Sequence, residues 1–541
     1  MGHYRIAIVA HFEQKDDCAP WRAYQDLKLA GHAVEMVELR QCRGLVVEGE
    51  LDREALRPFE EVFKPDYVAW QGETAEEILQ ALAGLPEHEG PAPRHFVVDG
   101  WVGKDNFGDE FLFKTICDRL RRDWPGCWVS LVGQDPTASL ARHGVAGAVH
   151  SEKAQINAML NGASALIFMG GILLDFSTMK STAGPIELFF NPGSTLPGQA
   201  ALCQIAALNE VPAVFLGIGA GPLGDEDACR LMRLESLSRP RYIARDAQTE
   251  RLLLAAGVDG SLVSRGADLA YAADYPPEAA RAAAGRIAGE LAGCAGYAAF
   301  ALREQEPHTA GIEAAAAEAA DRLFEERGLG SVLLAFDPAD APMQERILGR
   351  MRHPQAALSL GTEDFEECCG VLGGAELVVC MRLHGSIIAA AQGVPGVGLA
   401  YNVKVGEAYR QLGMEDFLLS VDATGDELAE RCLALADRRE EASRRVAAGA
   451  AEARRLAEGA FEELRDIVDA HEPAPHRQAS YPRSVSQEAL RRKKAQRELR
   501  EARGQLQAAQ AENAELKARL EEAEASAGGR RGRRRPGRSR G

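Results

Sequence analysis

The sequence predicts an α/β protein built from parallel β-sheets. Short apolar runs of strand length, such as residues 5–11 (RIAIVAH) and Ala165–Met169 (ALIFM), recur between helical patterns. Strands that alternate with helices indicate βαβ units, and continuous apolar runs are typical of strands buried on both faces. The chain has 541 residues, of which 46% are hydrophobic and 26% charged. This ordinary globular composition gives room for roughly three or four domains.

The first 90 residues are predicted to form an accessory α/β module. Its expected strands and helices are residues 5–11, 21–29, 33–39, Tyr67–Trp70 and 74–85, in the order strand, helix, strand, strand, helix. Residues 86–93 (PEHEGPAP) have the composition of a linker.

Two further α/β units follow, which we expect at residues 95–270 and 271–468. The strands predicted for the first are His95–Asp99, 128–132, Ala165–Met169, 213–217 and 242–245. Those predicted for the second are 298–302, 332–336, Leu377–Cys380 and Gly396–Ala400. Terminal helices are expected between 424 and 468, then a linker at 469–485, a coiled coil at 486–526 and a basic disordered tail at 527–541.

The formal net charge of −18 conceals a strong asymmetry. From Ser486 to Gly541 there are sixteen Lys and Arg against eight Asp and Glu, so this segment carries +8 and the remainder −26. The acidic body argues against nucleic acid as the main ligand. Because signal-peptide layout, apolar spanning runs and CxxC pairs are all absent, we expect a cytoplasmic protein, with peripheral membrane association left open.

The basic segment contains a heptad pattern. Leu499, Leu506, Asn513 and Leu520 are seven residues apart, and an alanine-rich series runs beside them. This a/d spacing predicts a homodimer through residues 495–523, with Asn513 as a register device; a single solvated helix is the alternative. Residues 528–541 hold seven arginines and no acid, which suits contact with a polyanion or anionic surface as well as a solvated tail.

Two glycine-containing turns follow predicted strands. Asn106-Phe107-Gly108-Asp109-Glu110 opens a helix after His95–Asp99, where free backbone N–H groups form a cradle for an anion or ligand. Asn106 is equally suited to cap that helix, and the two acidic residues to its first turn. Gly170-Gly171, with Asp175 beyond, ends the strand Ala165–Met169, where a ligand site and a tight turn are both consistent with the pattern.

Arg245-Asp246, followed by Asp268, comes after the strand at 242–245, and this pair is expected to be structural. The preceding turn, Gly217-Ile218-Gly219, lacks the spacing of a dinucleotide-binding loop.

The most specific pattern is Arg382-Leu383-His384, which follows the strand Leu377–Cys380. Lys404 follows the next strand, Gly396–Ala400, at the same sheet edge. Arginine, histidine and lysine at neighbouring strand ends predict an anion site that contains a titratable group.

These pieces, in this order, resemble the polysaccharide pyruvyltransferase family over residues 95–430. The residues that carry the resemblance are Asn106–Glu110, Gly170-Gly171 with Asp175, Gly217-Ile218-Gly219 with Pro222, Arg245-Asp246, Asp268, Arg382-Leu383-His384, and Tyr401 with Lys404. Two positions depart from the family pattern: Met169 stands where a third glycine is usual, and Leu302-Arg303-Glu304 only loosely matches its strand-ending arginine.

The resemblance implies a glycosyltransferase-B-like pair of Rossmann-type domains that transfers pyruvate from phosphoenolpyruvate to a sugar or glycan acceptor as a ketal. It implies His384 and Asp109 as catalytic residues. Substrate contacts would come from Arg382, Lys404, Arg303, Asn106, Gly108, Glu110, Gly170 and Gly171. Neither a metal nor a resident cofactor is expected, and phosphoenolpyruvate serves as co-substrate. Acceptor choice is expected in residues 176–198 and in the N-terminal module.

Two other functions compete with this interpretation. The first is a nucleotide-sugar glycosyltransferase of the same fold. Residues 1–39 resemble the opening of such enzymes, although their pattern is equally that of a generic βαβ unit. The second is a non-catalytic scaffold, in which a decayed transferase domain presents the coiled coil and the basic tail.

If residues 495–523 pair two chains, removing residues 486–541 should convert a dimer into a monomer, because the a/d seam is buried only in the pair. Sedimentation equilibrium of the full and shortened chains measures the change. An unchanged number of chains per particle would contradict dimerisation through the heptads.

Overall fold

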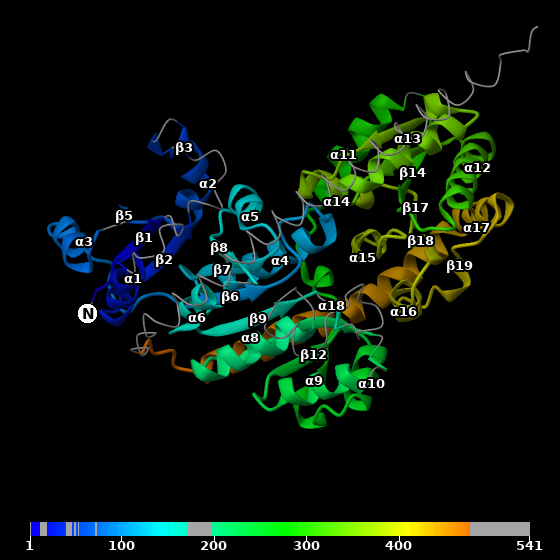
Figure 1. Cartoon of the computed structure of the whole chain (residues 1–541). Coiled ribbons are helices and arrows are strands. Elements are labelled where there is room, and N and C mark those ends of the chain that lie inside the picture. The colour runs from blue at the N-terminus through cyan, green and yellow to red at the C-terminus, as the bar shows by residue number, and fades with distance from the viewer. Residues whose placement is uncertain are drawn as a thin grey trace, which may run out of the picture. The chain divides into compact units, whose positions relative to one another are not determined.

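Two parallel sheets form the centre of the fold, which confirms the predicted class (Figure 1). The computed structural model describes residues 2–10, 19–38, 46–47, 50–51, 53–70, 73–150, 152–170, 172–173, 196–221, 223–224, 226–291 and 293–476. Residues 1–476 form one unit by their internal contacts. The predicted coiled coil, its dimer segment, the basic tail, Gly171 and Asp175 lie outside the described residues.

The first sheet has the order β13-β12-β11-β9-β6-β7-β8, with β10 paired to β11, and its pairings are parallel. Its strands are β6 (His95–Asp99), β7 (Trp128–Gly133), β8 (Gly147–Val149), β9 (Ala165–Met169), β10 (Ile172–Leu173), β11 (Ala213–Ala220), β12 (Arg241–Ala244) and β13 (Val263–Arg265). Its helices are α4 (Phe107–Asp123), α5 (Pro136–His143), α6 (Lys153–Leu160), α8 (Leu196–Leu208), α9 (Glu226–Ser236) and α10 (Ala247–Ala255).

The second sheet has the order β16-β15-β14-β17-β18-β19 and is also parallel. Its strands are β14 (Gly296–Ala301), β15 (Leu329–Leu334), β16 (Ala357–Leu360), β17 (Leu377–Cys380), β18 (Gly396–Ala400) and β19 (Leu418–Ser420). Its helices are α11 (Pro277–Glu290), α12 (Thr309–Arg327), α13 (Ala341–Arg350), α14 (Phe365–Gly373), α15 (Leu383–Ala391), α16 (Val403–Gln411), α17 (Gly425–Asp437) and α18 (Arg439–Asp469). Strand β15 ends before Phe336, which the sequence had placed inside a strand.

Each sheet contains a topological switch point. Strand β6 lies between β7 and β9, and β14 lies between β15 and β17, so the chain leaves these central strands in opposite directions. Connections that diverge in this way open a crevice at the carboxyl ends of the strands, where α/β proteins bind ligands. The motifs at Asn106, Gly170, Arg303 and Arg382 all follow strands beside a switch point.

The N-terminal residues form a small sheet of their own, with the order β2-β1-β5. Its elements are β1 (Arg5–Ala10), α1 (Ala19–Leu29), β2 (Ala33–Glu38), α2 (Arg53–Phe63), β5 (Tyr67–Trp70) and α3 (Ala75–Leu82), with a hairpin of β3 (Val46–Val47) and β4 (Glu50–Leu51). Buried polar groups join it to the first sheet: Ser130 donates to Glu35 over 2.5 Å and contacts His95 Nε2 over 2.7 Å. Burial raises the pKa of Glu35 to about 7.

Helix α18 connects the two central sheets. It follows the second sheet in the sequence, yet its C-terminal part packs on the first: Ser264 Oγ donates to Glu463 over 2.7 Å, and Arg94 Nη2 lies 3.3 Å from Asp469 Oδ1. None of the described helices combines the length and apolar character needed to cross a lipid bilayer.

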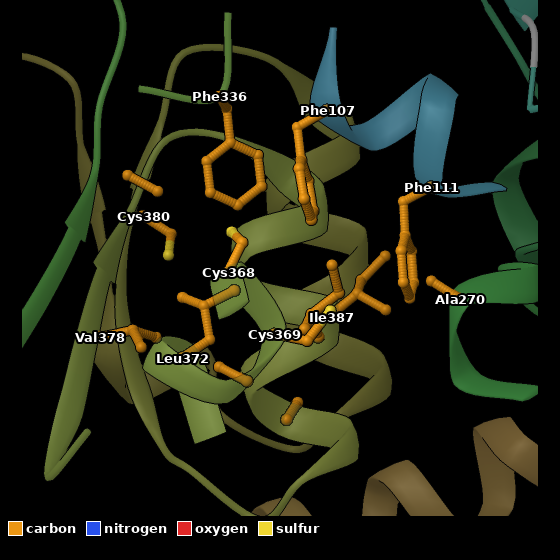
Figure 2. Packing of buried hydrophobic residues seen from close by; sticks show 14 of the residues in the cluster. Phe107, Phe111, Ala270, Phe336, Cys368, Cys369, Leu372, Val378, Cys380 and Ile387 are labelled. Atoms are coloured by element: carbon orange, nitrogen blue, oxygen red, sulfur yellow. The ribbon is translucent and has the colours of Figure 1, made fainter. Parts of the chain in front are cut away.

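A continuous apolar core runs between the two sheets (Figure 2). Phe107 and Phe111 of α4 extend into it, and the rings of Phe107 and Phe336 meet edge-on with centroids 4.8 Å apart. The Phe107 N–H also donates to the Phe336 carbonyl over 2.8 Å. These contacts fix the start of α4 against the second sheet.

Glu235 of α9 is a buried carboxyl beside the first sheet. Its side chain is fully buried and accepts a hydrogen bond from Tyr242 Oη over 2.7 Å. Burial raises the pKa of Glu235 to about 8, against the lowering effect of the Tyr242 hydroxyl. The folded state therefore holds a proton on Glu235 that the unfolded chain releases at lower pH.

This raised pKa predicts a pH-dependent loss of stability. The contribution of Glu235 to folding stability is fully present below the pKa that this residue has in the unfolded chain. It is lost as pH rises through about 8, the pKa in the folded protein. The Glu235→Gln variant retains an oxygen for Tyr242 but cannot ionise. The Tm of this variant minus the Tm of wild type should therefore increase as pH rises from 5 to 8 and stay constant at higher pH. Glu278→Gln, at an exposed position on α11, is the control. A Tm difference independent of pH would contradict the assignment.

Candidate functional site

Eight of the ten predicted site residues, all except Glu110 and Gly171, the latter outside the described residues, line one cavity of about 310 Å³ between the carboxyl ends of the two sheets. The first sheet and its connections supply Asp99, Gly100, Trp101, Asn106, Gly108, Asp109, Met169, Gly170, Gln199 and Arg245. The second sheet and its connections supply Arg303, Phe336, Arg382, Leu383, His384, Tyr401, Asn402 and Lys404. Residues as far apart in the sequence as Asp99 and Lys404, 305 positions, thus form one site.

Asn106 occupies the N-cap position of α4, but its side chain makes no capping hydrogen bond. It lines the cavity instead. The uncapped amide groups at the start of α4 remain suited to an anion or a ligand oxygen. The sequence was consistent with two roles for Asn106, a ligand contact and a side-chain cap of α4, and the side-chain cap is absent.

Gly108 is required by the position of His384. A Cβ at residue 108 would lie 2.0 Å from His384 Nδ1, which is far inside van der Waals contact. The missing side chain lets α4 of the first sheet meet α15 of the second. Gly108 thus acts by admitting the imidazole to the cavity.

His384 is largely covered, with 14% of its side chain exposed, and lies close to a carboxylate of the first sheet. Its Nε2 is 3.7 Å from Asp268 Oδ2 and has no hydrogen-bond partner among the described residues. Burial lowers the pKa of His384; Asp268 opposes this shift, and Arg245, Lys404 and Arg382 add to it. The imidazole is therefore held mainly neutral at neutral pH and is available as a proton acceptor.

Arg382 is held by carboxylates that the sequence analysis missed. Its Nε and Nη2 donate to Asp340 over 2.9 and 2.6 Å, and Nη2 lies 3.8 Å from Asp337. This bidentate pair orients the guanidinium at the cavity wall. Both aspartates follow β15, beside the switch point, and that location was the available signal.

Asp109 and Lys404 form an electrostatically coupled pair across the cavity. Burial raises the pKa of Asp109 to about 7, against the attraction of Lys404. Burial likewise lowers the pKa of Lys404 to about 7, with the repulsion of Arg245 adding to the shift and Asp109 opposing it. Both groups therefore change protonation near neutral pH, as acid–base groups of active sites commonly do.

Arg245 was expected to be structural, but the structure places it in the cavity wall. Its Nη1 donates to Asp268 over 3.3 Å, and its Nε lies 3.6 Å from Asp246. It therefore both pairs with carboxylates and adds positive charge to the site. Its position after β12, at the same sheet edge as the other motifs, could have indicated this.

Arg303 lies over the Tyr401 ring, with its guanidinium carbon 5.2 Å from the ring centroid. It lines the cavity despite its loose match to the family pattern. Gly170 also lines it, with a φ of +55° that favours glycine.

Glu110 is not among the residues that line the cavity, and its expected contact with substrate stays a prediction. Its carboxylate accepts hydrogen bonds from the Gly103 N–H and contacts His143 Nε2, each over 2.7 Å. Burial alone would raise its pKa, but these hydrogen bonds outweigh burial and lower it. Glu110 thus fixes the loop that precedes α4.

Among the described residues, no group of three or more His, Cys, Asp or Glu side chains is arranged to hold a metal ion.

Two Rossmann-type sheets that face a shared, cation-lined cavity define a glycosyltransferase-B-like protein. A family model described as polysaccharide pyruvyl transferase matches residues 106–403, more than half of the chain. The chain therefore belongs to the polysaccharide pyruvyl transferase family.

Several solved structures are similar at low sequence identity. They include Anabaena HepE in complex with UDP and glucose, at 12% identity and a TM-score of 0.47, covering 70% of this chain and 100% of that one. Staphylococcus aureus MnaA with UDP shows 10% identity and a TM-score of 0.48, covering 71% and 100%. A Rickettsia africae glycosyltransferase shows 9% identity and a TM-score of 0.47, covering 70% and 100%. No protein of curated function matches the sequence.

Gly108→Ala should disturb the site because its methyl group would collide with the His384 imidazole. We expect a destabilisation of about 1–3 kcal/mol, as for overpacked interiors, with a shifted His384 imidazole resonance. Thermal unfolding and proton NMR measure the two effects. Gly311→Ala is the matched control, since nothing lies within 4 Å of a Cβ there. Equal effects of the two substitutions would contradict the close approach.

Proposed function

We propose that the protein transfers pyruvate from phosphoenolpyruvate to two hydroxyl groups of a sugar, forming a ketal. The observation that carries this proposal is the convergence of Arg245, Arg303, Arg382 and Lys404 on one cavity that also holds His384 and Asp109. Phosphoenolpyruvate has a phosphate and a carboxylate, and a set of cations is suited to bind both.

The reaction needs proton transfers but no oxidant or reductant. One acceptor hydroxyl adds to C2 of the enol, while C3 gains a proton and becomes a methyl group. The second hydroxyl then forms a bond to C2 as the bond from C2 to the phosphate oxygen breaks, and inorganic phosphate leaves with that electron pair. Of the two protons released by the hydroxyls, one balances the proton gained at C3 and the other is carried away with phosphate.

The shifted pKa values suggest how these protons move. His384 has a lowered pKa, so its neutral imidazole can accept a hydroxyl proton. Asp109 has a pKa near 7, so its protonated form is well populated and can donate toward C3. Because their environments shift the two pKa values in opposite directions, His384 can act as a base and Asp109 as an acid at the same pH.

The proposal predicts that the purified chain binds phosphoenolpyruvate and releases phosphate from it only when a suitable glycan precursor is added. Lys404→Ala should weaken phosphoenolpyruvate binding about tenfold or more, because one charge-assisted contact contributes about 1.5–3 kcal/mol. His384→Ala should retain binding but lose about 100-fold or more in turnover. Calorimetry and a phosphate assay with a panel of precursors measure these effects.

Lys114→Ala, at an exposed position on α4, controls for loss of a lysine. Full turnover by His384→Ala would overturn its catalytic role. Binding of a nucleoside-diphosphate sugar without affinity for phosphoenolpyruvate would instead support a glycosyltransferase. Failure to bind either ligand would favour the non-catalytic scaffold.

A further inference from the structure

The first-sheet side of the cavity carries a second set of groups that the donor chemistry does not use. Asp99 ends β6, Trp101 follows it, and Gln199 lies in α8; all three line the cavity. Asp99 and Trp101 precede the residues matched by the family model. The wall from the second sheet supplies Arg303, Arg382 and Lys404, whereas the first-sheet side combines one cation, Arg245, with the carboxyl groups of Asp99 and Asp109.

Asp99 is a carboxylate fixed in the cavity wall. Its side chain is only 2% exposed, and its Oδ1 lies 2.5 Å from Nε2 of His150, which follows β8. The two atoms approach without hydrogen-bond geometry, so Asp99 Oδ1 has no hydrogen-bond partner among the described residues. Lys153, at the start of α6, lies near enough that Asp99 raises its pKa against the larger lowering effect of burial. A carboxylate held in this way disfavours an anion beside it but readily accepts a hydrogen bond from a hydroxyl group.

Gln199 adds an amide to the same wall. Its side chain is 5% exposed, and its Oε1 has no hydrogen-bond partner among the described residues. A buried amide oxygen without a partner, on a residue that lines a cavity, is typically satisfied by a ligand or by water. Gln199 can therefore accept a hydrogen bond through Oε1 and donate through Nε2.

Trp101 supplies an apolar face at the same place. Its side chain is 46% exposed although it lines the cavity, so much of the indole surface is uncovered. Binding sites commonly pair such an aromatic surface with a few convergent polar groups. A pyranose has matching chemistry, because it presents an apolar C–H face and a rim of hydroxyl groups.

We propose that Asp99, Gln199 and Trp101 form the subsite for the acceptor, which they bind as an uncharged pyranose ring stacked on the indole. Asp99 and Gln199 hold its hydroxyl groups, and His150 positions the Asp99 carboxylate. This subsite rests on the proposed function, in which the second substrate is a sugar. It places acceptor recognition on the first-sheet side of the cavity, whereas three of the four cations that would hold phosphoenolpyruvate come from the second sheet.

The test measures sugar binding and donor binding separately on the full chain. The sugar probes are the methyl α-glycopyranosides of galactose, mannose and glucose, titrated at millimolar concentration by saturation-transfer NMR. Phosphoenolpyruvate binding is measured by calorimetry. At least one glycoside should bind wild type, and Asp99→Ala and Trp101→Ala should each weaken that binding about tenfold or more, as expected for loss of a charged hydrogen bond or an aromatic face.

His150→Gln should weaken glycoside binding while phosphoenolpyruvate affinity stays within about twofold, a split that general damage to the fold would not produce. Asp274→Ala and Leu237→Ala, both at exposed positions, are the controls. Glycoside binding that is lost in the Asp99 and Trp101 variants but present in the controls supports the subsite, even if phosphoenolpyruvate fails to bind and the proposed reaction falls. No glycoside binding by wild type, or equal binding by all variants, overturns the subsite while leaving the donor site intact.

Discussion

The site depends on the insertion of the first turn of α4 between the two sheets. The Phe107 N–H donates to the Phe336 carbonyl, and the two rings meet in the shared core. One residue later, Gly108 leaves the space that the His384 imidazole occupies. A glycine beside a buried phenylalanine thus fixes the distance between the sheets at the point where chemistry is proposed. Asp109, the next residue, is thereby placed with the cations of the second sheet.

Burial of several charged groups in one cavity gives the site its electrostatic character. Burial raises the pKa of Asp109 and lowers the pKa of Lys404, so both reach about 7. Asp340 and Asp268 partly neutralise Arg382 and Arg245, which keeps these arginines ordered in the protein interior. The result is a set of fixed cations with proton-transfer groups among them, and a wall of Asp99, Gln199 and Trp101 facing them.

Much of this site could be predicted because its residues follow strands. Parallel strands bring their carboxyl ends to one edge, so the motifs after β17 and β18 were expected to meet. The motifs after β6 and β9 belong to the other sheet, and only the family resemblance implied that the two domains face each other across a cleft. Glu110 belongs to the same short motif as Asn106 and Asp109, but its carboxylate turns toward Gly103 and His143, which the motif did not indicate. Sequence patterns did not reveal the roles of Arg245, Asp340 and Asp337 in the site, because a charged residue at the end of a strand does not indicate which side chain it will pair with. Trp101 and Gln199 were missed because neither stands in a charged motif.

The sequence by itself determined the α/β class, the parallel sheets, the family and three cationic residues of the cavity, Arg303, Arg382 and Lys404, because apolar periodicity and strand-end motifs are local properties of the chain. Only the tertiary structure decided which of these residues share a cavity, which carboxylates hold the arginines and how burial shifts the pKa values of Asp109, Lys404 and His384. It also placed the end of α18 on the first sheet. These features depend on distances between segments remote in sequence, and on removal from water, which no local pattern records.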